Sequence, residues 1–525
     1  MPVGSREFVL SDVAGAGSDV LRALAGTASD GLGWANGTAA RTRRRTWLDT
    51  FDWLLYRAGL TLEQVASAGR TELVLTERNG EVLAVEQLPA GSRPSWPSLV
   101  CELPAGPLRA RLQPVAGIRA LLPVARAISK VGELQALNSD AKTVARLAVD
   151  RMAVTFPARA TVPARLTVAP VRGYQNQAEN VGRVIGAMPG VRADQGSALE
   201  AALAAVGRRP GDLPGKAGGV HLTASLPAVT AMAAILTALL DVLEANVPGT
   251  IRDIDTEFLH DLRVAVRWTR SALKLCGSAL PAGLAGAYRP EFRWLGDLTT
   301  PARDLDVYLL GYPGMAAGLV GATETDLIPF REHLQRSRAS AHRQLTTGLR
   351  SARFARLRIG WRAALADVHP ARRRLAVGQL ADTRIAAAHR LALRIGGEIT
   401  AASPPQSLHD LRKRCKELRY LVEMFGSLHD PGQRSQAVRE LKALQDCLGE
   451  FQDAEVQRDE IRLFAAQMLE QHTAPAETLL AMGEIAASLA RRQIRARAQF
   501  DGRFADFAGP ASRARLAALA RTAAG

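Results

Sequence analysis

Two segments of the chain share one opening, and this repeat is the feature that most constrains the fold. "LHDLRVAVRWTRSALKLCGSAL" begins at Leu259 and "LHDLRKRCKELRYLVEMFGSL" begins at Leu408. Adding 149 to a position in the first copy gives its counterpart in the second, without a gap, for almost fifty residues. A gapless offset of this kind indicates an internal duplication, so this part of the chain should fold as two related halves with pseudo-two-fold symmetry.

The texture of the sequence changes near residue 208. Before it, β-rich runs alternate with turns, and "TELVLTERNGEVLAVEQLP" predicts a hairpin because Asn79 and Gly80 both tolerate a positive φ. "RARLQPVAGIRALLPVARAISKVGEL", from Arg109, also has the texture of strands. After residue 208, apolar residues recur every three or four positions, which predicts helices at 224–246, 257–280, 284–300, 325–350, 378–398, 407–427, 435–470 and 476–508.

These patterns predict an α+β multidomain protein. A β-rich domain with peripheral helices would occupy 1–207, a linker 208–221, an all-α domain 222–510 and a C-terminal tail 511–525. "GRRPGDLPGKAGG" marks the linker, because it concentrates glycine and proline. Short Pro/Gly stretches such as "YPGMAAG" and "SPPQ" should separate the helices.

The charge balance points to an anionic partner. Lysine and arginine exceed aspartate and glutamate by 67 to 51, which gives a formal net charge of +16. Such an excess suits nucleic acid, a membrane surface or polyphosphate. The four cysteines form no CxxC pair, so we expect a reduced, cytoplasmic protein. The N-terminal sequence has no export signal and no long uninterrupted apolar run follows it, so we predict no membrane insertion.

On a helical wheel, each copy of the repeat carries a basic stripe beside its apolar face. At about 100° per residue, the stripe falls within an arc of roughly 80°. The adjoining arc holds leucines that anchor the helix, so the stripe should lie in a groove or along an edge. The stripe residues are His260, Arg263, Arg267, Arg270 and Lys274 in the first copy and His409, Arg412, Lys413, Lys416 and Arg419 in the second.

A charged stripe on a single helix is usually a solvated face. Such faces mix the two signs at i and i+4, whereas the first stripe is uniformly positive and self-repelling. Its recurrence in the second copy favours a bound anion as the neutralising partner. A first-turn histidine is usually a cap or core residue, but both copies place it with the arginines, where it can donate to phosphate oxygen. Acids such as Asp304 and Asp453 could orient these cations, and they are too few to argue a metal site.

At these residues the chain resembles the CHAD domains, a family of histidine-containing α-helical domains. The resemblance covers roughly 222–510. It rests on "FLHDLRVAVRWTRSALKL", "WLGDLTTPARDLDVYL", "SLHDLRKRCKELRYLVEMFG" and "LKALQDCLGEFQDAEV", which occur in the family's order. It implies two duplicated four-helix bundles around a basic channel, and binding of inorganic polyphosphate without catalysis.

The same resemblance implies which side chains contact the phosphates. They are the ten residues of the two stripes, joined by Arg303 in "PARDLDV" and by Arg338, His342 and Arg343 in "RSRASAHRQL". The halves are unequal, because the second copy has Gln452 where the first has Arg303, and Glu423 where the first has Lys274.

The first half resembles a divergent CYTH domain, which is a triphosphate-tunnel antiparallel β-barrel. The likeness rests on "WLDTFDWLLYRAGLTL", "VLTERNG", "LNSDAKTVARLAVD" and "LTVAPVRGYQNQAENVGRVI". Active members open with Glu-x-Glu-x-Lys, whereas "SREFVLSD" offers only Glu7, with Leu10 and Ser11 where further polar ligands are needed. Without paired carboxylates, metal-assisted attack on a triphosphate lacks its ion, so we expect an inactive or strongly altered barrel.

The leading hypothesis is a cytoplasmic protein that binds inorganic polyphosphate and needs no cofactor. The resemblance also implies an association with polyphosphate granules. One alternative is a triphosphatase or other phosphohydrolase acting through the N-terminal domain, which the missing carboxylates disfavour. Another alternative is a nucleic-acid-binding module. The basic stripes lack the interleaved aromatic residues that base stacking needs, which disfavours this third reading for the helices.

Overall fold

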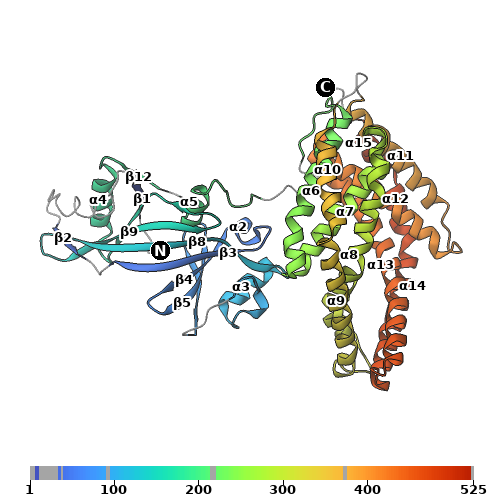
Figure 1. Ribbon diagram of the computed structural model, residues 1–525, viewed down its shortest axis with the longest axis horizontal. Helices are drawn as coiled ribbons and strands as arrows, with labels where there is room; N and C mark the ends of the chain where they lie inside the picture. The colour runs from blue at the N-terminus through green and yellow to red at the C-terminus, as the bar shows by residue number, and fades with distance from the viewer. Residues whose placement is uncertain are drawn as a thin grey trace. The chain divides into compact units, whose positions relative to one another are not determined.

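The computed structural model divides the chain into two compact units, Met1–Leu213 and Pro214–Gly525, and the dividing point falls within the segment predicted as a linker. The described residues are 6–10, 33–36, 40–89, 95–194, 196–212, 220–369 and 375–521. The first unit is built on an antiparallel sheet and the second consists of helices (Figure 1). This confirms the predicted fold class.

The N-terminal unit has a twelve-stranded sheet whose main path runs β12-β1-β11-β9-β8-β3-β4-β5-β6. Every pairing along it is antiparallel, and the long strands β8 and β9 form its centre. The predicted hairpin joins β5 to β6, with Gly80 at φ 86°. The strands are β1 Arg6–Leu10, β2 Gly33–Asn36, β3 Arg41–Asp49, β4 Leu60–Ser67, β5 Arg70–Glu77, β6 Val82–Leu88, β7 Ser98–Leu99, β8 Ala120–Leu137, β9 Thr143–Phe156, β10 Ala160–Thr161, β11 Arg165–Pro170 and β12 Val191–Ala193.

Short helices pack on this sheet and complete its apolar clusters. They are α2 Leu54–Arg57, α3 Pro107–Ala116, α4 Gln175–Gly186 and α5 Ala198–Ala204. The start of the segment predicted as strand from Arg109 is instead part of α3. Proline at the first position and buried Leu108 and Leu112, four residues apart, favour a helix there.

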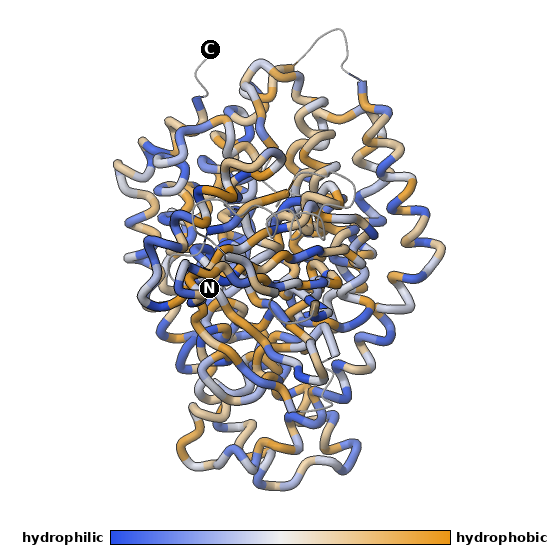
Figure 2. Tube along the Cα trace, turned by 90° about the vertical axis from the view of Figure 1, so that its left-hand side faces the viewer, coloured by the Kyte–Doolittle hydropathy of each residue, from blue (hydrophilic) through white to orange (hydrophobic). Residues whose placement is uncertain are grey.

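The helical unit repeats five helices. The first copy contributes α6 Ala228–Arg252, α7 Thr256–Cys276, α8 Leu284–Ala317, α9 Ile328–Leu349 and α10 Ala352–Ala366. The second contributes α11 Val377–Gly397, α12 Pro405–Met424, α13 Pro431–Glu470, α14 Ala476–Ala508 and α15 Pro510–Leu519. Adding 149 to the bounds of α7 gives 405–425, nearly those of α12. Hydrophobic and hydrophilic residues are interspersed along the helices in Figure 2, as expected for amphipathic helices that bury one face.

Contacts between equivalent positions indicate the pseudo-two-fold axis. The Tyr308 hydroxyl of α8 donates to the backbone carbonyl of Gln457 on α13 at 3.5 Å, and these residues are 149 positions apart. Trp268 of α7 and Tyr420 of α12, which are not equivalent positions, also meet between the copies, with ring centroids 5.3 Å apart. Only residues near a symmetry axis can touch their own counterparts, so the axis passes between the two copies at α8 and α13.

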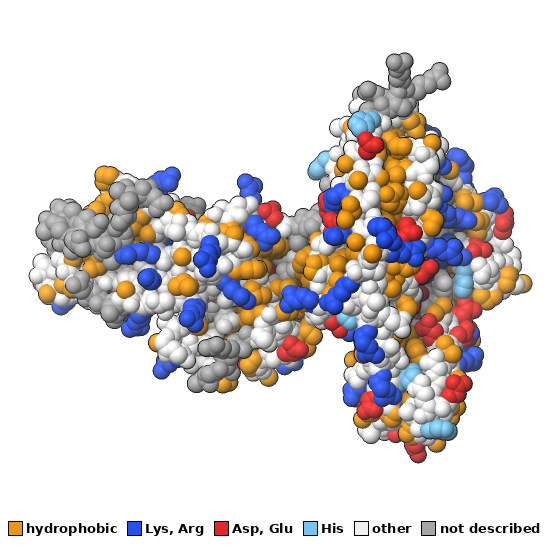
Figure 3. Space-filling model, viewed as in Figure 1, with side chains coloured by type: hydrophobic (Ala, Val, Ile, Leu, Met, Phe, Trp, Pro, Cys, Tyr) orange, Lys and Arg blue, Asp and Glu red, His pale blue; other side chains and the backbone are white. Residues whose placement is uncertain are grey.

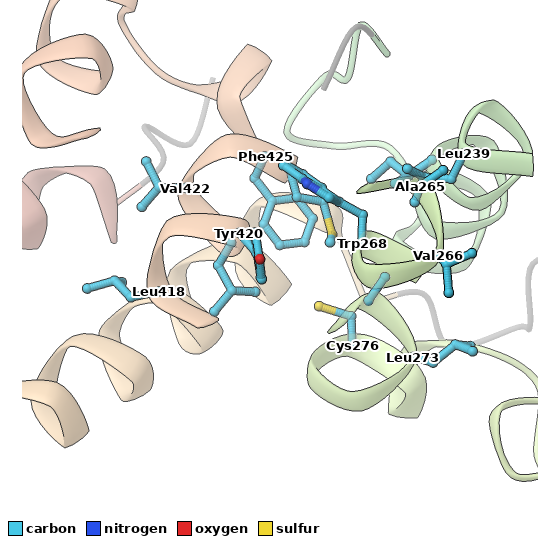
Figure 4. Packing of buried hydrophobic residues seen from close by; sticks show 14 of the residues in the cluster. Leu239, Ala265, Val266, Trp268, Leu273, Cys276, Leu418, Tyr420, Val422 and Phe425 are labelled. Carbon is cyan, nitrogen blue, oxygen red and sulfur yellow. The ribbon is translucent and has the colours of Figure 1, made fainter. Parts of the chain in front are cut away.

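Each of the two main apolar clusters of this unit draws helices from both copies. The larger one joins α6 and α7 to α11 and α12, and Figure 4 shows Trp268, Tyr420 and Phe425 together at that junction. The smaller one joins the C-terminal halves of α8 and α13 to the N-terminal halves of α9 and α14, around Phe330 and Met468. Each copy therefore depends on the other for its core.

Three features of the helical unit differ from the expectations. Helix α8 runs on through Pro301 and "YPGMAA" to Ala317, because Tyr308 and Tyr312 on its far half are buried in the smaller cluster. Helix α10 was not predicted, although its buried Phe354, Leu357 and Trp361 have helical spacing. The segment predicted as a C-terminal tail contains α15, whose Leu516 and Leu519 are buried in the larger cluster.

Helix α6 is, among the described residues, the one helix long and apolar enough to cross a membrane by length and composition. Its Ala231, Met232, Leu236 and Leu239 are fully buried in the larger cluster of the helical unit. This packing between α7, α10 and α11 accounts for the apolar composition of the helix.

Candidate functional site

Helices α7 and α12 hold the two basic stripes beside buried apolar faces, as the wheel predicts. Asp255 caps α7 by accepting from the backbone N–H groups of Glu257 and Phe258, which fixes where the helix starts. Leu262 on α7 and Leu411 on α12 are fully buried. Since stripe and core are adjacent arcs of one helix, the cations emerge at the edge of the packed interface.

The two stripes converge at equivalent positions, Arg267 and Lys416. Burial first, and then the neighbouring guanidinium groups of Arg412, Arg267 and Arg419, together lower the pKa of Lys416 to about 8. Arg267 comes from the other copy, so the two helices share one electrostatic environment. Arg267 and Arg419 lie on the same aromatic ring, with guanidinium carbons 5.9 and 5.8 Å from the centroid of Tyr420.

In the first copy, neutral groups hold the basic side chains. Arg263 donates through Nη1 to the hydroxyls of Thr299, at 3.1 Å, and Thr300, at 2.8 Å, both on α8. Burial lowers the pKa of Arg263, Asp304 opposes this, and three other arginines reinforce it. Arg270 is exposed and its guanidinium lies against Gly296, where a β-carbon would come within 2.6 Å of Nη1. Within the described parts of the chain, Arg263, Arg267 and Arg270 have no ion pair within 4 Å, so Lys274 is the member of this stripe's basic run that a carboxylate neutralises.

In the second copy, carboxylates lie close to most of the stripe. Arg412 donates to Gln452 at 3.0 Å and to Asp453 at 3.1 Å. Lys413 Nζ lies 3.1 Å from Asp410, and Arg419 Nε lies 3.7 Å from Glu423. His409 Nε2 lies 2.9 Å from Glu455 Oε2. Across the copies, Lys274 of α7 pairs with Glu417 of α12.

Of the four further candidates, Arg303, Arg338 and His342 lie around the start of α7. Arg303 donates to the carbonyl of Thr256 at 3.3 Å and adds to the repulsion felt by Arg263. Arg338 is tied to Asp253 and, through Nε at 2.8 Å, to Asp306, and the Asp253 contact is the main reason that its pKa is raised. Its charge is therefore already neutralised. His342 Nε2 lies 2.8 Å from the carbonyl of Thr250, Arg343 is exposed on α9, and His260 is half-buried on α7.

Two groups at the site were not selected from the sequence. Tyr420 is 3% exposed and its ring faces arginines from both copies. Thr299 and Thr300 receive Arg263, although threonines inside a helix usually bond their own backbone, as both also do. An aromatic residue directly after Arg419 was a visible signal for the first, whereas the threonines gave none.

The surface of the helical unit reflects this arrangement. Figure 3 shows Lys and Arg side chains gathered in a band over the region of α7, α8, α12 and α13, with Asp and Glu side chains below it, toward α9 and α14.

In the N-terminal unit, the candidate metal ligand Glu7 lies beside a cation. The Glu7 carboxylate accepts from Arg165 Nη2 at 2.7 Å, and Arg165 Nη1 lies 2.8 Å from Asp194. Leu10 is buried in the core, and Ser11 lies outside the described residues. Within the described parts of the chain, no group of three or more His, Cys, Asp or Glu side chains could hold a metal ion.

Comparison with known families places the helical unit. Residues 234–462 match the family model of the CHAD domain, which confirms the resemblance seen in the repeat. No curated protein matches the chain.

Solved structures resemble each unit. The CHAD domain from the plant Ricinus communis is 24% identical over 58% of this chain and 96% of its own, with a TM-score of 0.43. PptA from Streptomyces chartreusis is 18% identical over 53% of this chain and 99% of its own, with a TM-score of 0.41. A putative adenylyl cyclase from Hippeastrum, described as having a dominant triphosphatase activity, is 11% identical over 34% of this chain and 85% of its own, with a TM-score of 0.23.

Proposed function

We propose that this protein, whose helical unit is a CHAD domain, binds inorganic polyphosphate along the shared basic edge of α7 and α12. The observation that carries the proposal is the convergence of Arg267 and Lys416, with Arg412 and Arg419 beside them, on one edge. Each of these cations raises the electrostatic free energy of the others, and a linear polyanion relieves all of these repulsions at once.

The residue types fit phosphate oxygens. Arginine can donate two parallel hydrogen bonds to one phosphate group, whereas lysine acts as a mobile point charge. Arg267, Arg270 and Lys274 are exposed and follow one another along α7 at intervals of three and four residues, so they line one side of the helix over two turns. A chain of phosphates laid along α7 would meet a cation at each turn.

Burial of Arg263 and Lys416 supports a binding role over a solvated one. A cation on a solvated face keeps its water shell, whereas Arg263 and Lys416 are partly buried, and burial lowers the pKa of both side chains. An anion beside them would restore the favourable electrostatic environment that water otherwise supplies. Cations held partly desolvated before the ligand arrives lose less hydration on binding, which favours affinity.

The test uses titration calorimetry to measure polyphosphate binding by the purified full chain over a range of salt concentrations. The combined variant Arg263→Glu, Arg267→Glu, Arg412→Glu and Lys416→Glu should lose at least about a hundredfold in affinity, since each charge-assisted contact contributes about 1.5–3 kcal/mol. It should also flatten the fall of affinity with salt that multiple phosphate contacts produce.

A matched control reverses four exposed arginines on other helices of the same unit, Arg293, Arg336, Arg394 and Arg462, whose ion pairs among the described residues are with acids three or four positions away. Its affinity for polyphosphate should stay within about threefold of the parent chain. Equal losses in the two variants would mean that only net charge matters, and the proposed site would be abandoned.

We propose a binding protein in preference to a triphosphatase. In the N-terminal unit Glu7 is engaged by Arg165, so its carboxylate already has a positively charged partner. Incubation of the full chain with triphosphate and Mg²⁺ or Mn²⁺ tests the alternative, and phosphate release that Glu7→Gln abolishes would establish it. Cytoplasmic location and association with polyphosphate granules follow from the same proposal, and co-sedimentation with isolated granules tests the second.

A further inference from the structure

A second basic surface lies on the open face of the N-terminal sheet. It consists of four exposed cations on three neighbouring strands, namely Arg44 of β3, Arg126 and Lys130 of β8, and Arg151 of β9. We call these four residues the sheet-face cluster. It belongs to a different unit from the helical stripes and shares no residue with them.

The strand register places the four side chains on one face. Lys130 lies directly opposite Arg151, and Arg44 lies opposite Ile128, which is two residues from both Arg126 and Lys130. The alternate residues Ala127, Ser129, Met152 and Val154 point to the other face, where each is at most 4% exposed. Directly opposite side chains are about 5 Å apart and diagonal ones about 7–8 Å, so the four charges form a compact group.

The part of the chain that the structure describes supplies no carboxylate to this cluster: none of the four side chains has an ion pair there. Like charges directly opposite each other on a sheet are destabilising. The pair Lys130 and Arg151 therefore costs folding stability in the free protein, and an anionic ligand would relieve that cost.

Apolar side chains stand among these cations. Ile128, at the centre of the cluster, is 39% exposed, and Phe156, opposite Arg126, is 40% exposed. The Arg126 guanidinium lies 5.7 Å from the centroid of the Phe156 ring. A ligand that only carried charge, such as inorganic polyphosphate, would leave both apolar groups in water, whereas single-stranded nucleic acid offers phosphates and flat bases together.

We propose that the sheet-face cluster binds single-stranded nucleic acid, with the four cations contacting phosphates and Phe156 stacking on a base. Arg126 and Lys130 are four residues, or about 13 Å, apart on β8, and Arg44 on β3 lies beside the midpoint between them, so the cations are spread over a length that more than one phosphate of an extended single strand can span. The aromatic rings beside the helical stripes, Trp268 and Tyr420, are buried and cannot stack on a base, so the two basic surfaces serve different polyanions.

The test measures fluorescence anisotropy of a labelled single-stranded oligonucleotide with the full chain. The variant Arg44→Glu, Lys130→Glu and Arg151→Glu should weaken binding at least about tenfold and reduce the slope of log affinity against log salt by about 2, since each phosphate contact contributes about 0.7. Its binding of inorganic polyphosphate should be unchanged. The helical charge-reversal variant should show the opposite pattern, so failure of either proposal is seen separately.

A charge-matched control reverses Arg70, Arg172 and Arg208, which are exposed on the same unit away from this face. It should bind the oligonucleotide as the parent chain does. Should charge reversal disturb folding, as judged by thermal melting, the neutral variant Arg44→Gln, Lys130→Gln and Arg151→Gln removes the repulsion and must still weaken binding. Equal binding by the parent and the sheet-face variants, or binding of anionic lipid vesicles without oligonucleotide binding, would overturn the proposal.

The aromatic contact has its own readout. Phe156→Leu should weaken oligonucleotide binding about tenfold at every salt concentration, leaving the salt slope intact, because a leucine side chain keeps apolar volume but cannot stack. An unchanged affinity would remove the base contact and leave a purely electrostatic surface.

Discussion

Helices α7 and α12 are duplicates in backbone and opposites in charge pairing. Both start with Leu-His-Asp-Leu-Arg and both bury their leucines in the same apolar cluster. In α7, however, Arg263 bonds to threonine hydroxyls, whereas its counterpart Arg412 bonds to Gln452 and Asp453. The acids are largely duplicated too, since Asp453 corresponds to Asp304 and Glu455 to Asp306, so the copies differ mainly in how these acids pair with the cations.

The difference continues along the two helices. Lys274 corresponds to Glu423, which lies 3.7 Å from Arg419, so the second stripe ends in an acid where the first ends in a base. A polyanion approaching the shared edge should therefore be held chiefly by the first copy, with Lys416 and Arg412 contributing from the second. Equal sequence at the motif does not mean equal contribution to binding.

The largest expected effect separates the two copies directly. The variant Arg267→Glu with Arg270→Glu should lose about a hundredfold in polyphosphate affinity, because both side chains are exposed and contact neutral groups. The matched variant Lys413→Glu with Arg419→Glu should lose about tenfold or less, since Asp410 and Glu423 already neutralise part of those charges. Titration calorimetry of both variants at one salt concentration measures the ratio.

Losses of equal size would contradict the inferred asymmetry and favour a ligand that lies symmetrically across the axis. Thermal melting of both variants serves as the control, because neither pair of side chains belongs to the apolar cores.

A pH effect of intermediate size should distinguish the equivalent positions Arg267 and Lys416. The pKa of Lys416 is lowered from 10.5 to about 8, first by burial and then by Arg412 and Arg267. Lys416 is mostly charged at about pH 7, half charged near its pKa and mostly neutral at about pH 9, so polyphosphate affinity should fall about tenfold across this range. Lys416→Arg, like Arg267 itself, stays charged and should flatten this part of the profile.

The stability of the free chain should respond with the opposite sign. Because the folded pKa of Lys416 lies below 10.5, the unfolded chain binds more protons between the two values, so the free energy of unfolding should rise as pH increases from 8 to 10.5. Lys413→Arg, on the exposed side of the same helix, is the control and should leave both profiles as they are. An unaltered affinity profile in Lys416→Arg would mean that another group titrates.

The fold was largely predictable from the sequence because its determinants are local or repeated. Helical periodicity placed most helices, and the offset of 149 related α7 to α12 before any contact was known. Helix α8 escaped prediction beyond residue 300 because burial of Tyr308 and Tyr312 outweighs the local effect of its prolines, and burial is set by α9 and α13, distant in sequence.

The site was predictable as a set of cations but not as a set of available charges. Arg338 is predicted as a phosphate ligand, and no sequence pattern indicates its pairing with Asp253 and Asp306, 85 and 32 positions away. No spacing rule links these three residues, since they meet only when α8 and α9 pack beside the end of α6. Side-chain pairing between helices is a property of the tertiary structure, so a helical wheel identifies the cations but cannot predict which of them are paired with acids.

The smallest expected effect concerns position 296, where the copies differ by Gly296 and Gln445. In the first copy the absence of a side chain lets the Arg270 guanidinium lie against α8, whereas Gln445 fills the place in the second and donates to the Cys415 carbonyl at 2.6 Å. Gly296→Ala would put a β-carbon 2.6 Å from Arg270 Nη1, and the flexible end of that side chain can move away. Stability should rise by about 0.5–1 kcal/mol, because alanine suits a helix interior better than glycine.

Polyphosphate affinity of Gly296→Ala should fall about twofold as Arg270 leaves its position. Calorimetry resolves this loss against the control Gly286→Ala, which lies on the same helix with open space around its β-carbon. A rise in stability without any change in affinity would show that Arg270 binds phosphate from solution without resting on α8.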